Sequence, residues 1–188
     1  LPDEKHAIIA SAEIAETLVI DLEEPAHSLQ IAGAPSSISA IRTSRNGASA
    51  CFYYSENNHL LVIKGLPATP AIRDSIDVSF AGLPLRRFAI SDDGSTALLA
   101  FRGEESDIVY SWTSSTGAQF VTTASRVSDI IFVAGDAVIA DSSANQVVLI
   151  RNVRDQASPL LVADSRDGLS EPVALSVSSR NEIYVGTA

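Results

Sequence analysis

The sequence repeats a pattern of short apolar runs around polar tips, with a spacing of about 43 residues. Residues 7–10 and 17–20 align without a gap with residues 137–140 and 147–150, three such steps further along the chain. Intermediate copies lie at residues 50–54 with 59–63 and at residues 97–101 with 107–112. Each copy therefore predicts an antiparallel pair of β-strands joined by a polar tip.

Two further runs complete each repeat. A first run precedes the pair at residues 38–41, 88–90, 130–133 and 173–177. A last run follows the pair at residues 28–32, 76–80, 119–122 and 160–162. Turns join the first run to the second, at Asn46-Gly47, Asp93-Gly94, Gly135-Asp136 and Arg180-Asn181, and glycine supplies the positive φ that such turns need. The unit is thus four short strands, which we call A to D in chain order.

Helices are not expected. The best helical candidate is residues 10–22, which are rich in Ala and Glu, but this segment aligns with a turn-containing segment of the other copies. A four-stranded antiparallel unit cannot bury both faces alone, so neighbouring units must stack. The period and the strand number match the blade of a β-propeller. We expect an all-β fold, a β-propeller of four-stranded antiparallel blades in a single region, residues 1–188. The expected blades are residues 1–35 (partial), 36–84, 85–127, 128–171 and 172–188 (partial).

Particular segments resemble known propeller repeats. Residues 137–150 resemble the NHL repeat, with an apolar pair, Ala-Asp-Ser, a polar turn with Asn and an apolar strand. Residues 172–177, followed by 182–185, are similar to the start of the next such repeat. Residues 88–97 are similar to the inner hairpin of YVTN, TolB-like and WD40-like propellers, although the Trp-Asp ending of WD40 blades is missing. The resemblance implies an NHL/YVTN-like bacterial β-propeller repeat protein.

The strand count suggests a partial ring. The pattern begins at a strand B and stops after a strand B, which predicts 17 strands, one too many for four closed blades. We expect part of a larger propeller of seven or eight blades. A four-bladed ring with a surplus strand, or a ring completed by another copy of the chain, are the alternatives. Open ends would expose strand edges that invite association.

Composition excludes several classes of protein. The 13 Lys and Arg against 23 Asp and Glu give a net charge of −10, which disfavours binding to nucleic acid. No apolar stretch approaches the roughly 20 residues that span a bilayer. The chain has no methionine and begins at Leu1, so we expect a processed product or an excised piece. The one cysteine, Cys51, lies in an apolar run and is expected to be a buried small hydrophobe.

The D-to-A connections and the B-to-C tips of a propeller converge on one face, where ligands bind. Arginines near one such rim of an acidic molecule could hold an acidic peptide or a glycan carboxylate. The possible ligand-binding rim consists of Arg86, Arg87, Arg126, Glu171, Asn58 and His59. The alternative is a set of solvated loops with unrelated arginines.

No catalytic, metal or cofactor site is expected. The histidines, at positions 6, 27 and 59, do not form a ligand pair on one strand. The segments 91–95 and 164–168 lack the spaced oxygen ligands of a calcium loop and are expected to be a turn and a loop. Trp112 is expected to pack inside the protein rather than to form a sugar platform.

We therefore expect a non-catalytic propeller scaffold that binds a protein or glycan partner, in the extracellular space or the periplasm. The rival is part of a propeller enzyme of the lactonase, lyase or quinoprotein type, with its catalytic residues in blades outside this chain.

Overall fold

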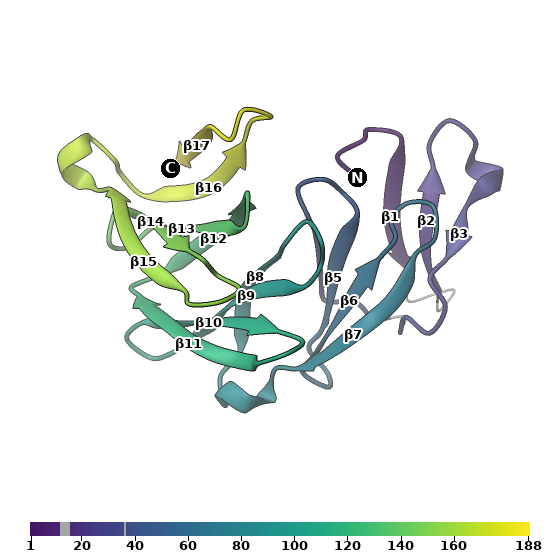
Figure 1. Ribbon diagram of the computed structural model, residues 1–188, viewed down its shortest axis with the longest axis horizontal. Coiled ribbons are helices and arrows are strands. Elements are labelled where there is room, and N and C mark those ends of the chain that lie inside the picture. Colours follow the sequence, from purple (N-terminus) through teal and green to yellow (C-terminus); the bar gives the residue numbers. More distant parts are fainter. Residues whose placement is uncertain (12–15, 36) are drawn as a thin grey trace. The chain divides into compact units, whose positions relative to one another are not determined.

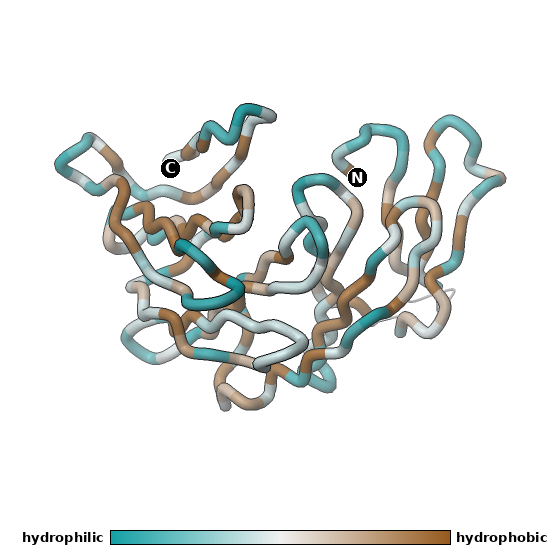
Figure 2. Tube along the Cα trace, in the orientation of Figure 1, coloured by the Kyte–Doolittle hydropathy of each residue, from teal (hydrophilic) through white to brown (hydrophobic). Residues whose placement is uncertain are grey.

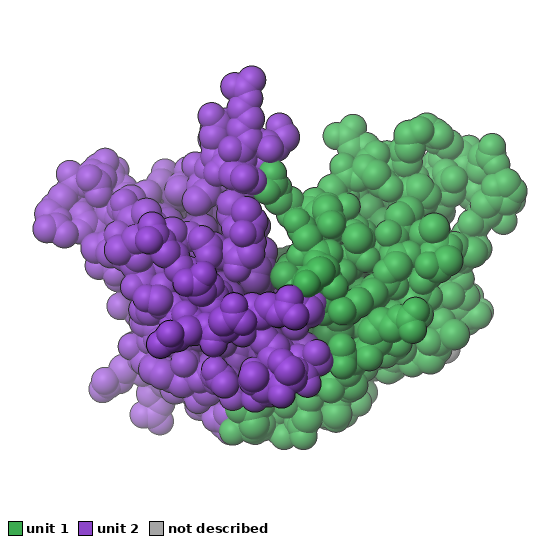
Figure 3. Space-filling model, viewed as in Figure 1, with its two compact units in different colours: residues 1–80, 90–94 green, residues 81–89, 95–188 purple. Residues whose placement is uncertain are grey.

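The protein is built from β-strands. The computed structural model describes residues 1–11, 16–35 and 37–188, in which it contains 17 strands, three short 3₁₀ turns and no α-helix (Figure 1). The expectation that residues 10–22 form no helix is confirmed where the structure describes them, because residues 10–11 end one strand and residues 16–21 form the next; residues 12–15 lie outside the described residues. The chain divides into two compact units, residues 1–80 with 90–94 and residues 81–89 with 95–188, coloured separately in Figure 3.

The first unit contains two antiparallel sheets. The three-stranded sheet consists of β1 (His6–Ser11), β2 (Glu16–Asp21) and β3 (Leu29–Gln30). The four-stranded sheet consists of β4 (Ala40–Thr43), β5 (Ser49–Tyr54), β6 (His59–Lys64) and β7 (Ala71–Asp77). Two 3₁₀ turns accompany these sheets, η1 (Pro25–His27) and η2 (Ser79–Ala81), the last residue of η2 belonging to the second unit.

The second unit contains three sheets. One consists of β8 (Leu85–Ile90), β9 (Thr96–Arg102), β10 (Asp107–Thr113) and β11 (Gly117–Ala124), with Ile90 assigned to the first unit. The next consists of β12 (Val127–Val133), β13 (Asp136–Asp141), β14 (Gln146–Arg151) and β15 (Ser158–Ala163). The 3₁₀ turn η3 (Ser165–Asp167) leads to a two-stranded sheet of β16 (Pro172–Val177) and β17 (Ile183–Thr187).

The order of strands follows the chain in every sheet, as the repeat predicts. The sheets of the described residues hold 3, 4, 4, 4 and 2 strands in chain order, which confirms three complete units flanked by two partial ones. Two details differ. The last strand of the second repeat is β7, which begins five residues earlier than the predicted run at 76–80, and the last two residues of that run, 79 and 80, belong to η2 instead. The expected residue ranges of the blades remain a prediction.

The third predicted turn is shifted by one residue. Ala134 and Gly135 both have a positive φ, of 51° and 91°, and Val133 pairs directly with Asp136. The two-residue turn is therefore Ala134-Gly135, and Asp136 is the first residue of β13. The sequence pattern identified the turn but could not show that an alanine occupies its first left-handed position.

The core lies on the second strand of each complete sheet. All six residues of β5 are buried, as are six of the seven in β9 and five of the six in β13. Figure 2 shows the same pattern, with apolar residues along the strands and polar residues at many of the turns. Cys51, on β5, is fully buried as expected, and burial raises the pKa of its thiol well above the ordinary value.

Candidate functional site: the loop surface of the second unit

A buried carboxylate joins the D-to-A connection before β12 to the B-to-C tip after β13. Asp141 is only 3% exposed, and its oxygens accept hydrogen bonds from the backbone N–H groups of Ser125 (2.6 Å), Arg126 (2.9 Å) and Ala144 (3.1 Å). The Ser142 N–H in turn donates to the Arg126 carbonyl at 3.0 Å. The two loops therefore converge, as the sequence predicts for propeller connections, and Asp141 is the residue that fixes them.

The same tip also holds the next D-to-A connection. Asn145, with a φ of 53°, accepts a hydrogen bond through its side-chain oxygen from the Glu171 N–H at 2.6 Å. Two of the predicted rim residues, Arg126 and Glu171, are thus attached to the first and last residues of the tip at residues 142–145. We call this surface, made by Arg126, residues 142–145 and Glu171, the loop surface of the second unit.

A second buried carboxylate supports the same connection from the preceding sheet. Asp107, at the start of β10, is fully buried, forms an ion pair with Arg102 and accepts a hydrogen bond from the Val127 N–H at 2.8 Å. Sequence reasoning missed both Asp107 and Asp141. In the sequence each of them is a single acidic residue where a strand B or C meets the tip. The apolar pattern does not distinguish such a residue from one exposed to solvent.

The predicted arginines differ in what they bind. The Arg87 side chain is partly buried and its Nε donates to the Ser128 carbonyl at 2.7 Å, so it links β8 to β12 and is a structural residue. Arg86 and Arg126 are exposed, and their guanidinium groups have no hydrogen-bond or ion-pair partner in the described part of the chain. Arg126 therefore combines a backbone fixed by Asp141 with a guanidinium that is available for a ligand.

Asn58 and His59 belong to the first unit, whereas the three arginines belong to the second. Asn58 has a φ of 54°, accepts a hydrogen bond from the Tyr53 hydroxyl at 3.3 Å, and its carbonyl accepts one from the Val78 N–H at 2.8 Å. The His59 Nδ1 lies 3.1 Å from the Ser75 hydroxyl. The Val78 contact fastens the tip after β5 to the connection after β7, as the Asn145 contact with Glu171 does for the tip after β13.

The histidines pair singly with nearby side chains. His6 lies 2.7 Å from Asp3, and His27 lies 2.7 Å from Glu24. Within residues 1–11, 16–35 and 37–188, no cluster of three or more His, Cys, Asp or Glu side chains could hold a metal ion. Trp112 is buried, with 9% of its surface exposed, as expected.

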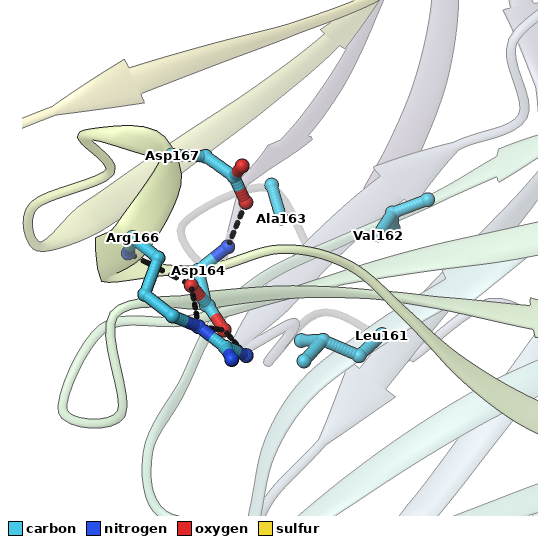
Figure 4. Close-up of a pocket in the computed structure, with 6 residues that line it drawn as sticks. All are labelled: Leu161, Val162, Ala163, Asp164, Arg166 and Asp167. Atoms are coloured by element: carbon cyan, nitrogen blue, oxygen red, sulfur yellow. Dashed lines mark hydrogen bonds and ion pairs between the residues drawn. The ribbon is translucent and has the colours of Figure 1, made fainter.

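A hollow of about 410 Å³ lies where β15 meets η3. Apolar residues of β15 and the polar residues of the turn line it (Figure 4): Leu161, Val162, Ala163, Asp164, Arg166 and Asp167. The Arg166 Nε lies 3.1 and 3.0 Å from the two Asp164 oxygens, and this hydrogen bond lowers the pKa of the Asp164 carboxyl. Asp164 and Arg166 therefore form an ion pair at the start of η3, and Asp164 caps this turn.

Comparison with solved structures shows the fold. The chain matches hydrazine synthase of Kuenenia stuttgartiensis with a TM-score of 0.60 and 17% identity, over 99% of this chain and 59% of that one. It matches a nidogen/laminin complex with a TM-score of 0.58 and 12% identity, over 97% of this chain and 68% of that one. A third match, with a TM-score of 0.50 and 15% identity, is the β-propeller domain of Myceliophteria thermophila Cps50 (Swd1), over 78% of this chain and 51% of that one.

The fold is a β-propeller of four-stranded antiparallel blades. The chain spans 59% of the length of the hydrazine synthase chain it matches. No family model and no curated protein matches the sequence. In the described residues, no helix is long and apolar enough to cross a membrane.

Proposed function

We propose that this chain is a non-catalytic β-propeller module that binds a protein or glycan partner through the loop surface of the second unit. The observation that carries the proposal is the Asp141 carboxylate, which holds Arg126 in place by its backbone and leaves the guanidinium without a partner among the described residues. Arg126 is exposed on a molecule with a net charge of −10. An arginine that is positioned but unpaired is suited to a carboxylate, which it binds through two parallel N–H donors.

The same reasoning gives the chemistry of the partner. A Glu-rich peptide or a glycan with uronic acid groups presents the carboxylates that Arg126 requires. Glu171, attached at the last residue of the same tip, would repel a partner that is acidic throughout, so we expect carboxylates to be spaced along the ligand.

We also assign the repeat to the NHL/YVTN-like group and the protein to the extracellular space or periplasm. The support for the first is the resemblance of residues 137–150 to the NHL repeat. The support for the second is the composition, which has few lysines and many Ser, Thr and Ala residues, as in secreted bacterial repeat proteins.

The test is a binding titration with two probes, a Glu-rich peptide and hyaluronan oligosaccharides, at low ionic strength. We expect one of them to bind, and Arg126→Gln to weaken the binding by roughly ten- to hundredfold, since a charge-assisted pair contributes roughly 1.5–3 kcal/mol. Arg180→Gln is the matched control, because Arg180 is an exposed arginine whose side chain has no partner among the described residues, in the turn between β16 and β17 at the opposite end of the strands.

The result that would contradict the proposal is equal weakening by both substitutions, or no binding of either probe. A calorimetric titration with calcium and zinc separates the scaffold from the propeller-enzyme alternative. Stoichiometric heat with either metal would count against the scaffold.

A further inference from the structure

Phe120, on the outer strand β11, is the most exposed large apolar side chain of the described residues. It is 60% exposed, and no other large apolar side chain of the strands β8 to β11 is exposed. Figure 1 shows β11 at the outer edge of this complete four-stranded sheet. The place of β11 in the fold explains why its surface meets solvent, but it does not explain why a phenylalanine lies there.

The Phe120 ring is supported by a row of aromatic side chains that leads to the core. The Tyr110 ring of β10 lies 6.1 Å from it, centroid to centroid, with an angle of 82° between the ring planes. Phe101 of β9, which is fully buried, lies 5.8 Å from Tyr110 at 86°. Such edge-to-face pairs are favourable. The Phe120 ring therefore has an orientation that is set before a ligand arrives, which lowers the entropic cost of binding.

Two exposed polar side chains of β11 lie near this ring. Tyr110 pairs with Phe120, and two residues earlier on β10 Ile108 pairs with Thr123. Because side chains on a strand alternate between faces, Thr123 lies on the same face of the sheet as Phe120. Gln119 directly precedes Phe120 at the edge. The side chains of Gln119 and Thr123 are exposed and form no hydrogen bond within the described residues, so their donors and acceptors are available to a ligand.

The surroundings of Phe120 carry no charge. Residues 108–125 are the longest stretch of the sequence without Asp, Glu, Lys or Arg, in a chain with a net charge of −10. The turn before β11, residues 114–116, exposes only serine and threonine side chains. Neither an anionic nor a cationic ligand would find a complementary charge on this strand. The surface is therefore suited to a neutral ligand that forms many hydrogen bonds.

A single exposed ring among hydroxyl groups fits a sugar better than a protein. The centre of a protein interface is formed by several apolar side chains, and this sheet exposes one. A pyranose ring has one apolar face of C–H groups, whose slight positive charge is attracted to the negative face of an aromatic ring. The hydroxyl groups at the rim of the sugar require neutral donors and acceptors beside the aromatic ring, such as those of Gln119 and Thr123.

We propose that the outer surface of β11 is a binding site for a neutral polysaccharide. The Phe120 ring stacks on the C–H face of one sugar unit. Gln119 and Thr123 form hydrogen bonds with the hydroxyl groups of that unit and of the next one along the polymer. This site is separate from the loop surface of the second unit, and the inference does not rest on the function proposed for that surface.

The test is an NMR titration of the full chain with three neutral oligosaccharides, cellohexaose, laminarihexaose and maltohexaose. The signals of the Phe120 ring and of the Gln119 side-chain amide are followed. We expect saturable shifts of both with at least one of the three sugars. Phe120→Ala should weaken this binding by about tenfold or more, the effect expected when one stacked aromatic contact is lost.

Three variants serve as controls. Phe120→Tyr retains the aromatic ring and should retain the binding. Tyr184→Ala removes another highly exposed aromatic side chain, 58% exposed on β17, and should leave the binding unchanged. Arg126→Gln should also leave it unchanged, because a neutral sugar does not need the guanidinium of the loop surface.

The proposal would be overturned if none of the three sugars shifted the Phe120 signals, or if Phe120→Ala had no larger effect than Tyr184→Ala. Loss of binding in Arg126→Gln with retention in Phe120→Ala would also overturn it, and would assign the sugar to the loop surface instead. Phe120 signals that move with protein concentration in the absence of sugar would identify a second copy of the chain as the occupant, which is likewise contrary to the proposal.

Discussion

At the scale of single residues, the fold depends on a few positions where the backbone or a buried polar group leaves little choice. Gly94 has a φ of 65°, and a Cβ atom there would lie 2.7 Å from the Ser49 hydroxyl and 2.9 Å from the Lys64 Cε. Tyr54 is nearly fully buried, and its hydroxyl donates to the Pro35 carbonyl at 3.3 Å. Both residues are fixed by close contacts of the first unit, so both give direct tests of the geometry.

We predict that Gly94→Val lowers the free energy of unfolding by about 1–3 kcal/mol, because it combines a branched side chain at positive φ with two close contacts. Gly82→Val is the control, since Gly82 has a φ of 61° but a Cβ atom added there would meet nothing within 4 Å. Urea denaturation measures both. A loss at Gly94 no larger than the loss at Gly82 would show that the contacts with Ser49 and Lys64 are absent.

Tyr54 predicts how stability changes at high pH. Burial raises the pKa of its hydroxyl to about 12 from the ordinary value of 10. Because the folded protein holds this proton more tightly than the unfolded chain, stability is complete below pH 10 and falls as the pH rises from about 10 to about 12. Burial also raises the pKa of Tyr53, which contributes in the same direction.

The measurement is the free energy of unfolding between about pH 9 and pH 12. This range includes the pKa of Tyr54 in the unfolded chain, about 10, and its pKa in the folded protein, about 12. In Tyr54→Phe the free energy of unfolding should decline less with rising pH, because phenylalanine has no hydroxyl proton to lose. If the free energy of unfolding of the variant declines as steeply with pH as that of the parent protein, Tyr54 is not buried as described.

At the scale of elements, two buried carboxylates hold the connection that leads into β12. Asp141 is the last residue of β13 and Asp107 the first residue of β10, and they accept hydrogen bonds from the neighbouring residues Arg126 and Val127, where β12 begins. Because these groups are buried, they rely on their backbone and arginine partners to offset the cost of desolvation.

We predict that Asp141→Ala lowers the free energy of unfolding by about 2–3 kcal/mol, since it leaves three backbone N–H groups without their charged acceptor. Asp155→Ala, at an exposed acid whose side chain has no hydrogen bond within the described residues, should change stability by less than about 0.5 kcal/mol. Thermal denaturation compares the two. Equal effects would mean that Asp141 does not fasten the loops.

The sequence predicted the strands better than the site. Alternating apolar runs and glycine turns were sufficient to place the strands in order, because registers such as Ala137 with Ile150 follow from a short tip between two apolar runs. The end of β7 was misplaced because Ser79–Ala81 forms a 3₁₀ turn within an apolar run. The roles of Asp141 and Asn145 could not be predicted, since they depend on backbone groups 15 to 26 residues away.

At the scale of the whole chain, one plan recurs. Each complete sheet has a buried second strand and an outer fourth strand with greater exposure. Comparison with solved structures shows that this plan is the β-propeller fold. Proteins of this fold differ in function, so the binding role proposed here rests on Arg126 and its loop surface.

The central claim is that the described chain is a series of repeated antiparallel sheets, and that the second strand of each complete sheet is its most buried strand. Amide hydrogen exchange, resolved by residue with NMR, tests this claim most directly. We predict the slowest exchange in β5, β9 and β13 and faster exchange in the outer strands β7, β11 and β15. Uniform protection along all strands, or slowest exchange in the outer strands, would contradict it.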